Sequence, residues 1–513
     1  MPRCAVETDD DTAFGGHSGK TLHTGAPSAP PPASSNCKKG TSCMAKEPIT
    51  AVVVGAGHRA LAYAAYAKAA PEELRIVGCA DPIELRRKQV QELYGLPDDR
   101  LYETAEELAA VGRFADTVIN GTMDHQHIET SVPLLEAGYH LLLEKPFATS
   151  ESEMWQLVET ARRCDRKVMI CHVLRYAPFY AAIRQKVLEG EIGQVMNVQT
   201  IEHVSYHHMA TCFVRGKWSR KDDCHSSMLM AKCCHDLDLI MWMKSGVAPK
   251  AVSSFGGQIY FCPERAPEGA GTRCLVDCPI EGACDYSARK MYIDHPHRWA
   301  AYVWFELEHL TEPTIEDKIA SLKGGNPHGR CVWGCDNDVV DHQTVCIEFE
   351  DGCTASHNLV GGTARPSRAI HLIGTHGEIQ GVMEDSTFVI RHIATRSGHE
   401  YTENELDLSI SGECMGPSVA TVAAMGGLQP ISSISCAEVP RPSRAPRSRI
   451  LSTATSSVSL LTKLGKSVGW LRLSRFEFRG PSVAPRRLWR VDACPAIAGR
   501  RRRIPSDRAV PPG

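Results

Sequence analysis

A glycine-rich segment directly after an apolar run is the first feature of this 513-residue sequence that could do chemistry. The run Ile49–Val54 has the pattern of a buried parallel strand, and a helical pattern follows the segment. Glycines there allow a tight turn and a close approach of the backbone to a pyrophosphate, and a small third residue lets the helix pack on the strand. The spacing G-x-G-x-x-A therefore predicts dinucleotide binding at Gly55, Ala56, Gly57, His58, Arg59 and Ala60.

A carboxylate at the end of the next apolar run favours the same ligand. Asp81 closes the run that begins at Val77, where a carboxylate can accept hydrogen bonds from an adenosine ribose. It favours NAD, because it would repel the 2′-phosphate of NADP. Arg86 and Arg87 could pair with that phosphate or could be surface charges of a helix, so NADP stays open.

Two later segments resemble the glucose-fructose oxidoreductase / inositol dehydrogenase (Gfo/Idh/MocA) family. Thr122-Met-Asp-His-Gln-His-Ile-Glu129 is similar to the family's T-P-x-x-x-H-x-E stretch, with Met123 in place of proline. Glu144-Lys145-Pro146 matches its E-K-P motif, for which the family implies a cis peptide bond before the proline. The resemblance covers about residues 49–380. Further cofactor contacts are expected from Thr122, His125, His127, Glu144, Lys145 and Arg175.

Lys145 and His235 are the candidate catalytic pair. A lysine at the carboxyl end of a buried strand can hold a substrate hydroxyl and ease its deprotonation, the alternative being a surface ion pair. The family usually carries D-x-x-x-H on a helix of its second domain, with the histidine as proton relay. The segment Ala231–His235 resembles that motif, with Ala231 where aspartate is expected. The resemblance implies His235 as general base, although a packed core histidine would have the same pattern.

Polar residues near these two are the candidates for tuning the reaction and binding substrate. Lys232 and Asp238 are each three positions from His235 and are expected on its helical face, where either could orient the imidazole. Lys232 is therefore a third catalytic candidate and Asp238 a substrate contact. Arg175 is equally compatible with a structural salt bridge. The remaining substrate-binding candidates, with ordinary surface side chains as the alternative, are Tyr206, His207 and Trp218.

Four cysteines in a segment rich in proline and glycine, residues 261–290, form a separate cluster. A tetrahedral zinc site or an iron–sulfur centre would give such a loop a reason to be ordered, but the spacing lacks paired C-x2-C motifs. Thiols without metal are therefore the main expectation. The candidate ligands are Cys262, Cys274, Cys278 and Cys284.

The elements that must position these residues alternate between strand and helix up to residue 172. Continuous apolar strands separated by amphipathic helices predict a doubly wound parallel sheet, a Rossmann domain at residues 48–172. Hairpin turns at Glu350–Gly352 and Thr375–Gly377 predict an α+β domain with an open, largely antiparallel sheet at residues 173–414. One helix is expected across Met228–Met243, and the first domain's last strand is expected to span Val168–Leu174.

Both ends of the chain differ in composition from these domains. Residues 1–47 are rich in Gly, Ser and Pro and predict a disordered leader. From residue 431 there are 17 Lys and Arg against 4 Asp and Glu, although the net charge of the whole chain is −3. Residues 415–513 show no sustained periodicity and are expected to be a disordered or non-native tail without regular elements.

Composition excludes several functional classes. No apolar run approaches the roughly 18 to 20 residues of a membrane-spanning helix, and the overall charge does not favour nucleic acid. The 21 cysteines, an odd number, fit reduced thiols and a cytoplasmic location better than a disulfide framework. A homo-oligomer is a family-level expectation.

The sequence therefore predicts an NAD(P)-dependent dehydrogenase that moves a hydride between nicotinamide and a secondary alcohol or ketone of a sugar, polyol or cyclitol. Two alternatives remain at this stage. One is an NAD-dependent glycosidase, and the other is a non-catalytic, dinucleotide-binding regulator.

Overall fold

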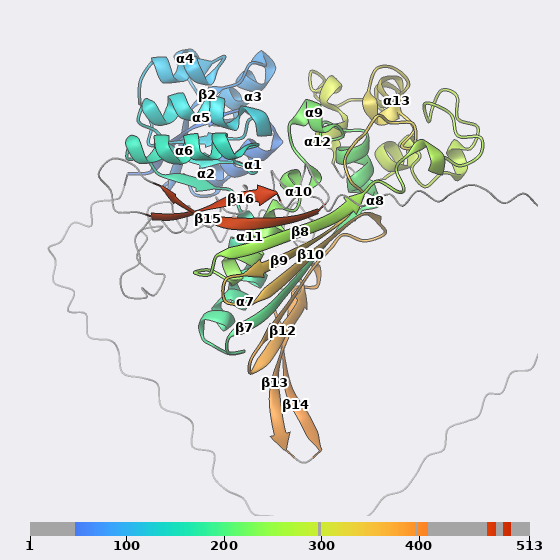
Figure 1. Cartoon of the computed structure of the whole chain (residues 1–513). Coiled ribbons are helices and arrows are strands. Elements are labelled where there is room, and N and C mark those ends of the chain that lie inside the picture. The colour runs from blue at the N-terminus through green and yellow to red at the C-terminus, as the bar shows by residue number, and fades with distance from the viewer. Residues whose placement is uncertain (1–46, 296–298, 397, 409–468, 479–485, 494–513) are drawn as a thin grey trace, which may run out of the picture. The chain divides into compact units, whose positions relative to one another are not determined.

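The computed structural model describes residues 47–295, 299–396, 398–408, 469–478 and 486–493 (Figure 1). The predicted leader, apart from Glu47, lies outside these residues. None of the described helices combines the length and apolar character that crossing a membrane requires.

The first domain is a six-stranded sheet in which every neighbouring pair is parallel. The strand order is β3-β2-β1-β4-β5-β6, so the direction of winding reverses between β1 and β4. Ligands of doubly wound sheets bind at the carboxyl ends of the strands beside such a reversal. The strands are β1 (Ile49–Val54), β2 (Leu74–Ala80), β3 (Leu101–Tyr102), β4 (Thr117–Asn120), β5 (His140–Leu143) and β6 (Val168–Ile170).

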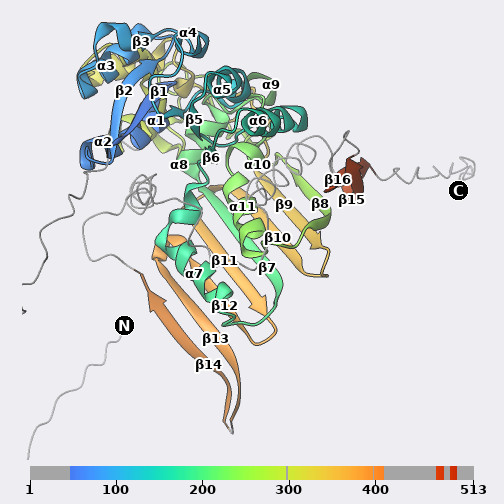
Figure 2. The ribbon, with the colours of Figure 1, turned by 90° about the vertical axis from the view of Figure 1, so that its left-hand side faces the viewer.

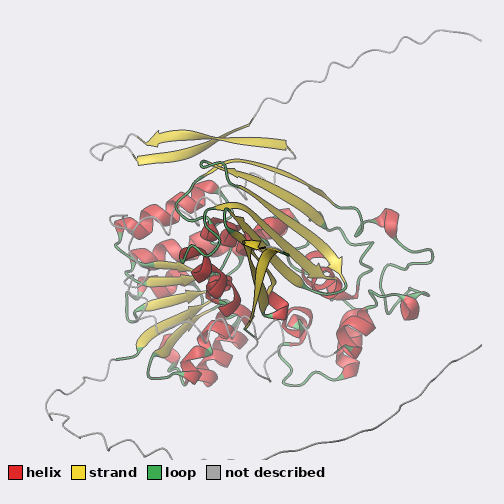
Figure 3. Cartoon of the chain, turned by 90° about the horizontal axis from the view of Figure 1, so that it is seen from below, coloured by secondary structure: helices red, strands yellow, loops and turns green. Residues whose placement is uncertain are grey.

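Both faces of this sheet are buried. Val52 and Val54 of β1 belong to one apolar cluster, and Ala51 and Val53 belong to another on the opposite face. Because alternate residues of a strand point to opposite faces, burial on both sides requires the continuous apolar run seen in the sequence. Figure 3 shows the helices on both sides of the sheet. They are α1 (His58–Ala64), α2 (Tyr66–Ala69), α3 (Glu84–Tyr94), α4 (Ala105–Ala110), α5 (His127–Glu136) and α6 (Glu151–Arg163).

The second domain is built on a ten-stranded, mostly antiparallel sheet of order β14-β13-β12-β11-β7-β10-β9-β8-β15-β16. Among the described strands, β7 and β10 pair in parallel. The predicted hairpins β9–β10 and β11–β12 are confirmed. The strands are β7 (Val195–Ser205), β8 (Pro249–Gly257), β9 (His342–Phe349), β10 (Thr354–Thr363), β11 (Ser367–Gly374), β12 (Gly377–Val382), β13 (Thr387–Arg396), β14 (His399–Asp407), β15 (Gly469–Phe478) and β16 (Arg486–Ala493).

Helix α11 packs against β7 and β10, and α7 lies on the same face of the sheet (Figure 2). This arrangement confirms the predicted fold class, a Rossmann domain followed by an α+β domain with a largely antiparallel sheet. The α-helices and π-helical turns described in the second domain are α7 (Pro178–Leu188), α8 (Tyr206–His208), η4 (Met209–Val214), α9 (Lys221–Cys224), α10 (Met228–Ala231), α11 (Cys234–Met243), η7 (Lys290–Asp294), α12 (Ala300–Val303) and α13 (Ile315–Lys323).

Two predicted elements near the site were wrong in extent. The single helix expected across Met228–Met243 is two helices, because Lys232 and Cys233 form a turn between them and the Cys233 backbone leaves the helical region. The strand expected to reach Leu174 ends at Ile170, and a 3-10 turn, Val173–Tyr176, follows it. Apolar residues continue through both boundaries, so hydrophobic pattern alone does not reveal them.

The expectation of no regular element after residue 415 was also wrong in two places. Gly469–Phe478 and Arg486–Ala493 form β15 and β16, and β15 pairs antiparallel with β8. Short runs of Trp, Leu and Phe interrupted by arginine support a strand when a sheet edge offers backbone partners. The other residues of the predicted tail lie outside the described part of the chain.

Candidate functional site

The glycine turn after β1 has the geometry that a dinucleotide requires. Gly55 has φ +71°, and a Cβ there would lie 2.8 Å from the backbone nitrogen of Thr122. A Cβ on Gly57 would meet no heavy atom within 4 Å, so the side of the turn that would face a pyrophosphate is open. Ala60 is fully buried, and a Cβ on Gly121 would lie 2.8 Å from its Cβ. Gly55 and Ala60 therefore allow close packing at the two ends of the motif, and Gly57 leaves room for a ligand in the middle.

Asp81 supports the turn from the end of β2. One carboxylate oxygen accepts a hydrogen bond from the backbone N–H of Ala56 at 2.8 Å, and the other accepts from Ile83 at 2.8 Å. The side chain is 4% exposed. Its predicted contact with the ribose would use the remaining lone pairs of these oxygens, and that contact stays a prediction.

Arg86 and Arg87 are already engaged within the protein. Arg86 donates from Nε and one terminal nitrogen to both carboxylate oxygens of Glu308, at 3.1 and 3.0 Å. Arg87 donates to the backbone carbonyl of Asp81 at 2.6 Å. Both guanidinium groups therefore already donate to protein oxygens, and neither is available to bind the 2′-phosphate of NADP.

The predicted residues after β4 mostly hold the loops in place. The hydroxyl of Thr122 donates to Asn120 Oδ1 at 2.9 Å. Nδ1 of buried His127 donates to the carbonyl oxygen of Pro146 at 2.7 Å, and its Nε2 lies 3.2 Å from the carbonyl oxygen of Thr122. The predicted direct cofactor contact of the His127 ring is thereby revised: the ring links the loops after β4 and β5. The His125 ring lies 5.2 Å from that of His225.

Glu144 is the polar anchor of the loop after β5. Its Oε1 pairs with Arg59 Nε at 3.2 Å and accepts from the Tyr63 hydroxyl at 3.2 Å. Its Oε2 accepts from the backbone nitrogen of Lys145. The Lys145–Pro146 peptide is cis, as the family resemblance implied. Glu144 therefore connects the helix after the glycine turn to the backbone that carries Lys145.

Lys145 reaches from the first domain to the second. Its ammonium donates to the backbone carbonyl of Ala231 at 2.8 Å. Ala231 is the position at which the family pattern expects aspartate, so a main-chain oxygen takes the place of a side-chain carboxylate. An ammonium has three N–H donors, and this bond uses one of them.

His235 lies at the start of α11, one helical break beyond Ala231. Its Nδ1 is buried and has no hydrogen-bond partner among the described residues. Burial, reinforced by the positive charge of Lys145, holds the pKa of His235 well below its usual value. The imidazole is therefore neutral near pH 7, which is the state that a general base requires.

His172 is a site residue that the sequence did not single out. Its ring lies 6.0 Å from the His235 ring in an edge-on arrangement, and burial lowers its pKa. It lies two residues after the end of β6, so it shares the carboxyl edge of the sheet with Lys145. That position was the signal that could have identified it.

Lys232 does not share a helical face with His235, which contradicts the prediction. The break after α10 directs its ammonium to Glu202 on β7, at 3.1 Å. Glu202 also pairs with Arg368, which lies 3.2 Å from Asp236. Lys232 therefore belongs to a buried network of charges, and its predicted catalytic role is replaced by a structural one.

Arg175 and Asp238 form a bidentate salt bridge. The guanidinium donates to both carboxylate oxygens at 2.6 Å, and Asp238 is 1% exposed. Of the two possibilities left open for Arg175, the structural salt bridge is observed. Asp238 as a substrate contact is revised for the same reason, because a buried carboxylate paired in this way has little capacity for a ligand.

The three remaining substrate candidates differ in accessibility. His207 is buried, and its Nε2 lies 2.9 Å from the carbonyl oxygen of Met291, so it is a packing residue. Tyr206 and Trp218 are only partly buried and keep their predicted role as proposals. The Tyr302 ring, which sequence did not indicate, lies 5.9 Å from His58 and 5.8 Å from Trp218.

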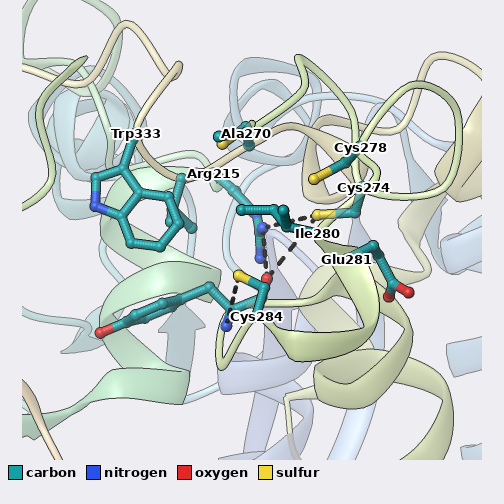
Figure 4. Close-up of a pocket in the computed structure, with 11 residues that line it drawn as sticks. Arg215, Ala270, Cys274, Cys278, Ile280, Glu281, Cys284 and Trp333 are labelled. Carbon is teal, nitrogen blue, oxygen red and sulfur yellow. Dashed lines mark hydrogen bonds between the residues drawn. The ribbon is translucent and has the colours of Figure 1, made fainter. Parts of the chain in front are cut away.

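The cysteine cluster is separate from these residues. Cys274, Cys278 and Cys284 line a small hollow together with Cys331, whereas Cys262 is not among its lining residues. Figure 4 shows Arg215 and Trp333 at the same hollow. The fold thus brings Cys331, which was not among the candidate ligands, to the same hollow as three of the four candidates.

Comparisons with known proteins agree with this geometry. Residues 49–172 match the family model GFO_IDH_MocA, described as an oxidoreductase family with an NAD-binding Rossmann fold. A putative oxidoreductase of Bacillus subtilis, YteT, is 24% identical over 307 residues, which is 59% of this chain and 68% of that protein. D-xylose 1-dehydrogenase (NADP+) of Hypocrea jecorina is 32% identical over 122 residues, covering 23% of this chain and 31% of that enzyme.

The solved structure of levoglucosan dehydrogenase in its apo form matches this chain with a TM-score of 0.56 at 14% identity. The match covers 83% of this chain and 98% of the levoglucosan dehydrogenase chain. That likeness extends the shared fold beyond the first domain. The chain therefore carries, in residues 49–172, the NAD-binding Rossmann domain of the Gfo/Idh/MocA oxidoreductase family.

Proposed function

We propose that this chain is an NAD-dependent dehydrogenase that oxidises a secondary alcohol of a sugar, polyol or cyclitol to a ketone, or catalyses the reverse reduction. The observation that carries the proposal is the placement of Lys145 and His235. Lys145 donates to Ala231 O at 2.8 Å, and His235 follows shortly after Ala231 with an unpartnered Nδ1. A cation and a neutral base lie together where doubly wound sheets bind ligands.

The residues at the glycine turn fit the cofactor. The open side of Gly57 would admit a pyrophosphate, and the positive φ of Gly55 maintains the turn. Arg59 is partly exposed and lies beside this turn, where it is paired with Glu144. When bound, NAD supplies the acceptor for the hydride that leaves the carbinol carbon.

The protein's own contribution is to bind the alcohol and remove its proton. An N–H of Lys145 not used by Ala231 would donate to the substrate hydroxyl and lower the cost of its ionisation. As the hydride leaves carbon, the hydroxyl proton passes to the neutral ring of His235, and the carbon–oxygen double bond forms.

The experiment is a substrate panel followed by NADH absorbance. Wild-type protein is expected to reduce NAD with at least one polyol, sugar or cyclitol. Lys145→Ala and His235→Ala are expected to lower kcat by about 100-fold or more, the scale of lost acid–base catalysis. His235→Ala should still bind NAD with affinity close to wild type. An Arg75→Ala variant, at an exposed position of β2, serves as a matched control with unchanged kcat.

The alternatives give different results in the same panel. A glycosidase would release free sugar from a glycoside without net formation of NADH. A regulator would bind NAD and turn over nothing across the panel, and that outcome would refute the dehydrogenase proposal. A cytoplasmic location and a homo-oligomeric state stay predictions.

A further inference from the structure

We propose that Lys217, a residue of the second domain, binds the pyrophosphate of NAD together with the glycine turn of the Rossmann domain. The inference concerns the cofactor and does not depend on the proposed dehydrogenase reaction. It rests on an ammonium without an ion-pair partner beside the loops that form the cofactor site, and on a backbone anchored so as to hold it there.

A buried arginine anchors the segment that carries this lysine. Arg215 follows the π-helical turn η4, and its side chain is 1% exposed. Its guanidinium donates to the carbonyl oxygens of Arg330 and Tyr286, at 2.7 and 2.8 Å. A Cβ on Gly216 would collide with the carbonyl oxygen of Thr211, so glycine is needed for the chain to turn this closely. The backbone at the next residue is therefore fixed in position.

The side chain of Lys217 extends to the Rossmann domain. Its ammonium donates to the thioether sulfur of Met123 at 3.2 Å. Met123 follows Thr122, whose backbone nitrogen would lie 2.8 Å from a Cβ on Gly55. The loop after β4 thus packs on the first glycine of the turn, and Lys217 contacts that loop one residue further along the chain.

Two aromatic rings place the same ammonium near the second part of the turn. Its nitrogen lies 4.6 Å from the centre of the Trp218 ring and 5.8 Å from that of Tyr302, and ring faces attract cations. The Tyr302 ring lies 5.9 Å from the ring of His58, the residue after Gly57. Burial lowers the pKa of His58, and the charges of Arg59 and Lys217 lower it further.

The charge of Lys217 is not neutralised at close range. Arg59 and Arg86 are paired with glutamates, whereas Lys217 forms no ion pair among the residues that the structure describes. Desolvation by the surrounding protein lowers the pKa of Lys217, although Asp124 raises it from a longer distance. The side chain is nevertheless exposed to solvent. An ammonium has three N–H donors, and a thioether is a weak acceptor, so two donors remain for an anion.

The pyrophosphate is the anion that the glycine turn brings to this place. Gly57 leaves the backbone open to it, and lysine is a common phosphate ligand because its charge is concentrated at one point. The substrate hydroxyl is assigned to another lysine, Lys145, whose ammonium is bonded to Ala231. Lys217 would therefore make cofactor affinity depend on the second domain as well as on the Rossmann domain.

The test compares binding of NADH and of ADP-ribose, which has the pyrophosphate but no nicotinamide, to the full chain. Lys217→Met removes the charge and should weaken both ligands by about tenfold, the scale of one hydrogen bond to a charged group. Lys217→Arg keeps the charge and should retain most of the affinity.

Lys68→Met is the matched control. Lys68 is also exposed and also lies over an aromatic ring, that of Tyr94 at 5.6 Å. It is near the end of α2, shortly before β2 begins, and so lies toward the opposite edge of the sheet from the glycine turn. Its replacement should leave both affinities unchanged, and thermal melts of every variant report folding.

Three results would overturn the proposal. Weaker binding of NADH alone would assign Lys217 to the nicotinamide half of the cofactor. Unchanged binding of both ligands, with a raised KM for substrate, would assign it to the substrate. A wild-type chain that binds neither ligand would remove the basis of the assignment.

Lysine acetylation of the wild-type chain, followed by mass spectrometry, decides the question if Lys217→Met fails to fold. ADP-ribose should slow the acetylation of Lys217 several-fold and leave that of Lys68 unchanged. Equal acetylation of Lys217 with and without saturating ADP-ribose would contradict the contact.

Discussion

The ammonium of Lys145 donates a 2.8 Å hydrogen bond to the carbonyl oxygen of Ala231, across the boundary between the two domains. The family pattern expects an aspartate side chain at position 231, and here the main chain supplies the acceptor. A neutral carbonyl orients an ammonium but stabilises its charge less than a carboxylate does. The reactivity of Lys145 should therefore respond to a carboxylate restored at this position.

Ala231→Asp is expected to raise kcat a few-fold with a substrate from the panel, because a charge-assisted hydrogen bond holds the Lys145 ammonium more firmly than a bond to a neutral carbonyl. Ala231→Asn, of nearly equal size and without charge, is the control and should leave kcat close to wild type. If both variants gave the same kcat, a charge at position 231 would not govern turnover.

Substitutions of the two glycines of the turn should separate folding from cofactor binding. Gly55→Ala forces a side chain into positive φ and against Thr122, and we expect a loss of about 1–3 kcal/mol in stability. Gly57→Ala meets no neighbour and should melt close to wild type, yet bind NAD at least about tenfold more weakly, since its methyl group occupies the pyrophosphate side. Thermal melts and NADH fluorescence titration measure the two effects. If Gly57→Ala bound NAD with wild-type affinity, the pyrophosphate would not lie against the glycine turn.

NAD is expected to bind at least about tenfold more tightly than NADP. The Asp81 carboxylate lies at the expected ribose position, and Arg86 and Arg87 are both engaged by protein oxygens. Glu308→Gln removes the partner of Arg86, and the released guanidinium should narrow that preference by improving NADP binding. Glu312→Gln, the same charge change at an exposed position four residues further along the chain, is the control. Titrations with NADH and NADPH compare the variants. A preference unaffected by Glu308→Gln would show that Arg86 does not reach the 2′-phosphate.

Stability should fall as the pH drops from about 6.5 toward 4. Burial lowers the pKa of His328 and of His357 to about 4 in the folded protein. Between these values the unfolded chain binds protons that the folded chain does not, so unfolding becomes easier by up to about 3 kcal/mol for each residue.

Melting curves at pH 7 and pH 5 measure this effect. His357→Gln removes one titrating group and should lessen the dependence on pH. An unchanged difference between the two pH values in that variant would exclude His357 as a source.

The sequence by itself determined the features whose physical cause is local. The glycine turn, the strand before it and the Asp81 carboxylate lie within one strand–turn–helix unit and the next strand, so residue type and spacing suffice to predict them. The alternation of apolar strands with amphipathic helices likewise predicts the doubly wound sheet, because both faces must be buried.

Tertiary structure alone decided which side chains meet. Lys232 was predicted beside His235, but the helix breaks there and Glu202 on β7 takes its ammonium. Cys331 joins three of the candidate cysteines at the hollow because backbone pairing brings its segment to Cys274. A partner from a distant strand or loop leaves no periodic signal in the local sequence. A buried charge pairs with whichever opposite charge the fold brings close, because that pairing offsets the cost of its desolvation.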